Sequence, residues 1–142
     1  MIVADELKTR IEVVEKSYEF FLAYAAQGVS GEQALKSSGQ VRDFLEQLQS
    51  SLPKLADLFS GLLAERGITD QECYRAFIDV LRRDAGSSLA AVQLVLAQPV
   101  VSSQMIDNLN ALIHLRALLT DVFLIDEILN QSLPGVDKTS VD

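Results

Sequence analysis

The chain has 142 residues, of which 49% are hydrophobic, and its 20 acidic and 12 basic residues give a net charge of -8. This length fits one domain with an ordinary buried core. The acidic charge argues against binding to nucleic acid or to anionic membranes, both of which need clustered Lys and Arg. The single cysteine excludes an internal disulfide, and the early acids Asp5 and Glu6 are unlike a signal peptide. The longest uncharged stretch, 85–106, is interrupted by Ser, Gln and Pro99, so we expect a soluble cytoplasmic protein without a membrane span.

Apolar residues recur at helical spacing through the first half of the chain. Residues 3–27 carry such a stripe, Gly28 should end that helix, and a second helix should begin at Ser30. Pro53 falls inside the next stripe, which keeps its phase, so we predict two nearly collinear helices or one kinked helix that ends at Gly67. The stripe alternates steps of four and three, as in a bundle seam: Val41, Leu45, Leu48, Leu52, Leu55, Phe59 and Leu62.

Two further segments precede the C-terminal one. Thr69 and Glu72 have the spacing of a capping box, so a helix should begin there, bury Cys73 in the core and end at Gly86. The apolar run 87–98 has no period that separates a helix from a strand. Its Ala and Leu content favours a helix, and a buried strand is the alternative.

The segment from Ser102 to Leu133 contains neither Pro nor Gly and is predicted to be one long helix, about 48 Å if straight. Its second half is apolar on all sides and should form the centre of the bundle or a contact between subunits. Residues 134–142 should be a flexible tail. The first half should face solvent along a polar stripe formed by Asp107, Asn110, His114 and Asp121. Asp107, His114 and Asp121 follow one another at seven-residue spacing, about 10 Å along a helix, which is too far to share one metal ion.

Together these segments predict an all-α, single-domain bundle of five to six helices over residues 1–133, elongated, with one long C-terminal helix. We find no catalytic motif, phosphate loop or metal-ligand pattern, so no catalytic, cofactor-binding or metal residue is assigned. We therefore expect a non-catalytic interaction protein, such as an adaptor, assembly factor or regulatory subunit, that forms a homodimer and binds an unidentified protein. The alternative is a carrier or sensor with an apolar small molecule inside the bundle.

Three sets of residues are candidates for these functions. A projecting apolar helix end needs cover, so the contact between two copies is expected at Phe123, Leu124, Ile125, Ile128 and Leu129. Asp126 falls in the apolar arc of this helix and should either reach water or form an ion pair that fixes helix register, with Arg42, Arg75 or Arg82. A bound ligand would be lined by Phe77, Leu112, Leu119 and Phe123.

Overall fold

The computed structural model describes residues 2–27, 31–68 and 72–131, without the side chains of 2, 31–38 and 129. The predicted flexible tail, 134–142, lies outside these residues, as do Gly28, Ser30 and Thr69. The described residues form helices and no strand, which confirms the predicted all-α bundle. The helices are α1 (Ile2–Ala26), α2 (Gly31–Ser51), the short 3-10 turn η1 (Leu52–Lys54), α3 (Leu55–Glu65), α4 (Glu72–Leu96), α5 (Ser103–Ala111) and α6 (Ile113–Leu129).

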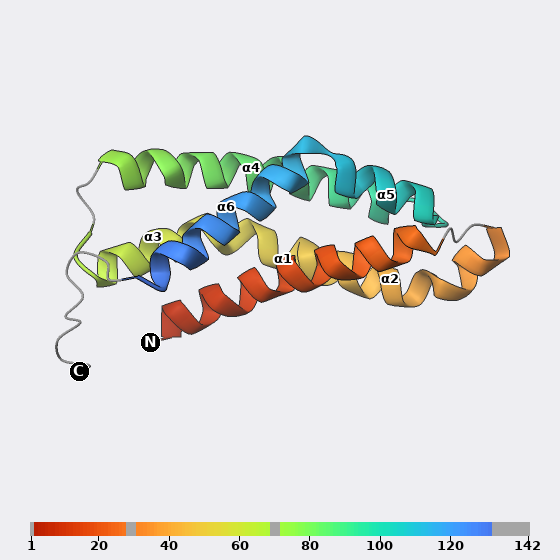
Figure 1. The fold of residues 1–142 in the computed structure, drawn as a ribbon, viewed down its shortest axis with the longest axis horizontal. Helices are drawn as coiled ribbons and strands as arrows, with labels where there is room; N and C mark the ends of the chain where they lie inside the picture. Colours follow the sequence, from red (N-terminus) through yellow and green to blue (C-terminus); the bar gives the residue numbers. More distant parts are fainter. Residues whose placement is uncertain (1, 28–30, 69–71, 132–142) are drawn as a thin grey trace.

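Helix α1 is the element around which much of the bundle is packed, with α2, α3 and α5 all against it (Figure 1). The predicted helix over 3–27 is confirmed. Its core positions follow the steps of three and four expected for one buried face, and Ser17 occupies one of them. The buried side chains along this face are Leu7, Ile11, Val14, Ser17, Phe21 and Tyr24.

The segment α2–η1–α3 contains the seam predicted over residues 41–62, and every residue of that seam is at most 1% exposed. Pro53 lies exposed in η1, so its missing N–H falls in a short turn between two helices. The helices on either side run on in nearly the same direction (Figure 1), which confirms the collinear pair. Gly67 ends the element with φ 73°, and the Ile68 N–H donates to the Leu63 carbonyl at 2.8 Å in a Schellman closure.

Helix α4 runs unbroken through Gly86, so the predicted end at that residue is wrong, and the run 87–98 is helical as far as Leu96. A glycine inside a helix costs about 1 kcal/mol. Burial of Leu81, Ala85 and Val92 on both sides of it outweighs that cost.

Cys73 is exposed, so the prediction that it is buried in the core is wrong. It lies in the first turn of α4, to one side of the helix face that carries Leu81, Ala85 and Val92.

The long C-terminal helix is also a wrong prediction, because Leu112 adopts an extended conformation (φ -61°, ψ 134°) between α5 and α6. The helix does begin at the predicted cap, where the Ser102 hydroxyl accepts a hydrogen bond from the Met105 N–H at 3.2 Å. Helix α5 packs on α1, whereas α6 packs mainly on α4 and crosses obliquely towards α1 (Figure 1). The change of direction at Leu112 lets the two halves bury their apolar faces against different neighbours.

Helix α6 lies on the surface of the bundle with one face inward, so its apolar half does not form the centre of the bundle, the first of the two predicted alternatives. Phe123 and Leu124 remain 48% and 50% exposed. On the predicted polar stripe, Asp107 and His114 are exposed as expected, but Asn110 is buried. The inward face of α6 is formed by Leu115, Leu118, Leu119, Val122 and Ile125.

Candidate functional site

An open apolar groove lies between the C-terminal part of α4 and helix α5. Its volume is about 350 Å³, and its two polar lining residues, Gln98 and Asn108, are uncharged. No charged side chain lines it, although 23% of the chain is charged. The apolar lining consists of Ala91, Leu94, Val95, Met105, Leu109 and Leu112.

Large apolar side chains stand in water at this groove. Leu94 on the α4 wall is 67% exposed, and Leu112 at the other wall is 39% exposed. Ile113, the next residue along the chain, is 73% exposed but lines a separate depression beside Tyr18 and Leu119 instead of this groove. Full burial of such a side chain is worth about 1.5–3 kcal/mol, so this surface favours contact with another apolar surface.

The connection between α4 and α5 is held by side chains from α1 and α2. Arg42 donates to the Leu96 carbonyl at 3.0 Å and also to the Gln98 carbonyl, and so satisfies acceptors at the C-terminal end of α4. The Tyr24 hydroxyl donates to the buried Val101 carbonyl at 2.7 Å, and burial raises the pKa of this phenol. These bonds fix the two walls of the groove relative to each other.

Two acidic side chains, Asp121 on α6 and Asp84 on α4, lie against each other where these helices pack. Burial, followed by hydrogen bonding to Asp84 and the charge of Asp84, raises the pKa of Asp121 to about 8. The Oδ2 atom of Asp121 is buried and has no hydrogen-bond donor. Two carboxylates cannot donate to each other, so this contact is satisfied only while the pair holds a proton.

Asp126 is half-buried on α6, and its side chain interacts with the carboxyl of Glu15 on α1. Burial first, and then the charges of Asp126 and Glu12, raise the pKa of Glu15. Two of the expected partners are bound elsewhere. Arg82 donates to Asp57 at 2.9 Å, and Arg42 donates to carbonyls at the end of α4. Asp126 thus meets an acid on α1, and its expected role in fixing helix register stays a prediction.

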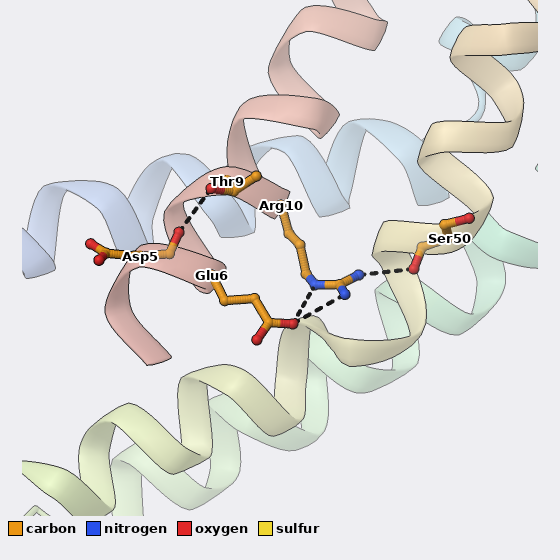
Figure 2. A network of polar contacts seen from close by, with 5 residues as sticks. All are labelled: Asp5, Glu6, Thr9, Arg10 and Ser50. Atoms are coloured by element: carbon orange, nitrogen blue, oxygen red, sulfur yellow. Dashed lines mark hydrogen bonds and ion pairs between the residues drawn. The ribbon is translucent and has the colours of Figure 1, made fainter. Parts of the chain in front are cut away.

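A larger and more polar groove, about 500 Å³, lies between α1 and α2. Figure 2 shows that its Arg10 is used within the fold. The guanidinium donates to Glu6 Oε2 at 3.2 and 3.1 Å and to the Ser50 carbonyl at 2.9 Å. Since the Ser50 carbonyl lies in the last turn of α2, this arginine ties that turn to α1. The contact explains helix packing and leaves the α4–α5 groove as the stronger candidate site.

The residues expected to line an internal ligand do not share one pocket. Leu112 lines the α4–α5 groove, whereas Leu119 lines a different depression beside Tyr18, between α1 and α6. Phe77 is partly buried on α4, and Phe123 is half-exposed on α6.

The residues of α6 that were expected to contact a second copy differ in how far they are exposed. Phe123 and Leu124 are available at the surface, but Ile125 is 1% exposed and belongs to the core. Ile128 is partly buried, and the side chain of Leu129 lies outside the described residues.

The α4–α5 groove was not predicted. The one signal in the sequence that could have pointed to it is the uncharged stretch 85–106, which supplies both of its walls as far as Met105.

Within the described ranges, no three His, Cys, Asp or Glu residues are grouped so that they could hold a metal ion. None of the helices described there has the length and hydropathy needed to cross a bilayer. The chain matches no family model, no curated protein and no solved structure. Its functional assignment therefore depends on the geometry of its own surfaces.

Proposed function

We propose that this chain is a non-catalytic helical interaction protein, an adaptor, assembly factor or regulatory subunit, that acts as a homodimer and contacts a further protein. The observation that supports this proposal is the charge-free apolar groove between α4 and α5, with Leu94 standing exposed on its wall. The exposed thiol of Cys73 fits a reducing compartment such as the cytoplasm. The net charge of -8 favours protein partners over nucleic acid.

The energy available from this surface suits a reversible association. Burial of the surface that Leu94 and Leu112 still expose would contribute about 1.5–3 kcal/mol. Association costs about 4–15 kcal/mol in lost translational and rotational freedom. A stable complex therefore needs the surrounding neutral surface as well, up to the roughly 800 Å² per partner of a standard interface.

Sedimentation velocity across micromolar concentrations tests the homodimer. The expected result is a species with twice the 15.6 kDa mass of one chain, in reversible exchange with single chains. A single-chain mass at every concentration would contradict the proposal.

The same groove supports a second candidate, a carrier or sensor of an apolar small molecule. Its volume of about 350 Å³ and its apolar lining lie within the range of small-molecule sites. Native mass spectrometry of protein purified from cells separates the two functions. A reproducible bound molecule on a single chain supports the carrier, and an unliganded dimer supports the interaction protein.

A further inference from the structure

We propose that two copies of this chain meet at the α4–α5 groove, with Leu94 of each copy filling the groove of the other. This inference rests on the proposed homodimer and assigns its interface to α4 and α5 in place of the C-terminal part of α6.

The shape of the surface suits contact with itself. In a dimer with two-fold symmetry the same patch lies on both sides of the interface, so it must carry both a protrusion and a hollow that receives it. The α4–α5 surface carries both. Leu94 stands on the rim with 67% of its surface exposed, and the hollow that it helps to line measures about 350 Å³.

The distribution of charge selects this surface over the end of α6. Two copies that each carry a charge of -8 repel each other, and any acid near the two-fold axis faces an acid on the partner. The two segments that form the groove, 91–98 and 105–112, contain one charged residue, Asp107, and its side chain does not line the groove. Phe123 and Leu124 are instead flanked by Asp121, Asp126 and Glu127. Pairing that end of α6 with a second copy would bring like charges together.

The groove is also held in shape without a partner. Arg42 and Tyr24 fix the backbone between α4 and α5 through the carbonyls of Leu96, Gln98 and Val101. A preformed surface loses less conformational entropy on binding, so more of the burial energy remains for association.

The test compares Leu94→Glu with Leu22→Glu by sedimentation velocity. Leu22 is a matched control because it is 50% exposed on α1 and does not line the groove. Both changes add the same charge to an exposed leucine, so circular dichroism should show the same helical content for both. We expect Leu94→Glu to weaken the dimer at least about tenfold and Leu22→Glu to leave it within about twofold of wild type.

Phe123→Glu distinguishes this interface from the one on α6. The proposal expects this variant to dimerise like the wild type. It is overturned if Phe123→Glu dissociates the dimer while Leu94→Glu does not, and in that case the proposed homodimer still stands. It is also overturned if Leu94→Glu removes a bound small molecule from a single chain. If the wild type is itself a single chain, the homodimer fails and this interface fails with it.

Discussion

The contact between Asp84 and Asp121 should make the stability of the protein fall as the pH rises. The folded state raises the pKa of Asp121 from 3.8 to about 8, through burial and through Asp84. Between these two values the folded chain holds a proton that the unfolded chain has released, so the free energy of unfolding decreases with increasing pH. The stabilising effect of this proton is complete below the unfolded pKa and is lost as the pH approaches 8.

The substitution Asp121→Asn supplies a neutral side chain of nearly the same shape and removes the cost of ionising the pair. A shift of this size would correspond to several kcal/mol for a fully buried group. Asp121 is only half-buried, and solvent screening reduces the expected gain at pH 8 to about 1–2 kcal/mol. For a chain of this length, that gain corresponds to an increase in Tm of about 3–6 °C.

Urea and thermal unfolding at pH 5 and pH 8, followed by circular dichroism, measure the effect. Asp121→Asn should exceed the wild type at both pH values, by much less at pH 5 than at pH 8. It should keep a weaker pH dependence of the same sign, because the pKa of Glu15 is also raised. Asp107→Asn is the control, since it removes one negative charge from an exposed position. Equal gains in the two variants would show a general charge effect and refute the specific role of the pair.

Four further substitutions test the helices and the groove. Gly86→Ala should raise the free energy of unfolding by about 0.5–1 kcal/mol, because the added Cβ meets no atom within 4 Å. The same change at Gly67, where φ is 73°, should lower it by about 1 kcal/mol, and urea unfolding of both variants checks the contrast in sign. Tyr24→Phe should cost about 1–3 kcal/mol in the same assay and speed amide exchange in residues 97–102, because the buried Val101 carbonyl loses its donor. Leu118→Ala should cost about 2–5 kcal/mol by creating a cavity under α6, and a cost below 1 kcal/mol would contradict the inward orientation of this side chain.

The sequence predicts best where one periodic pattern continues over many residues. The seam over 41–62 passes through Pro53 without losing phase, and the structure keeps it buried from end to end. A proline can be accommodated there because a single 3-10 turn absorbs the missing hydrogen bond while the apolar face stays aligned.

Local rules fail where packing outweighs them. Gly86 resembles a helix end, but its cost of about 1 kcal/mol is smaller than the gain from the apolar residues that follow it in α4. Leu112 resembles the interior of a helix, yet the chain is extended there because α5 and α6 have different partners. Neither outcome can be read from a window of neighbouring residues, because the energies that decide it come from other helices.

The acidic contacts were missed for a related reason. A buried carboxylate in a sequence is expected to find an arginine, but Asp121 and Asp126 lie against Asp84 and Glu15. Charge composition alone does not reveal this arrangement, since it depends on how α6 is seated between α4 and α1.

The apolar face of α6 explains why that helix docks in spite of these contacts. Burial of Leu115, Leu118, Val122 and Ile125 contributes about 6–12 kcal/mol, more than the acidic contacts cost. To reach this position the chain must leave the direction of α5 at Leu112, and the same residue then lines the α4–α5 groove. The break that seats α6 therefore also leaves Leu112 partly exposed at the proposed interface. A sequence in which residues 102–133 resemble one continuous helix therefore does not show that Leu112 reaches this groove.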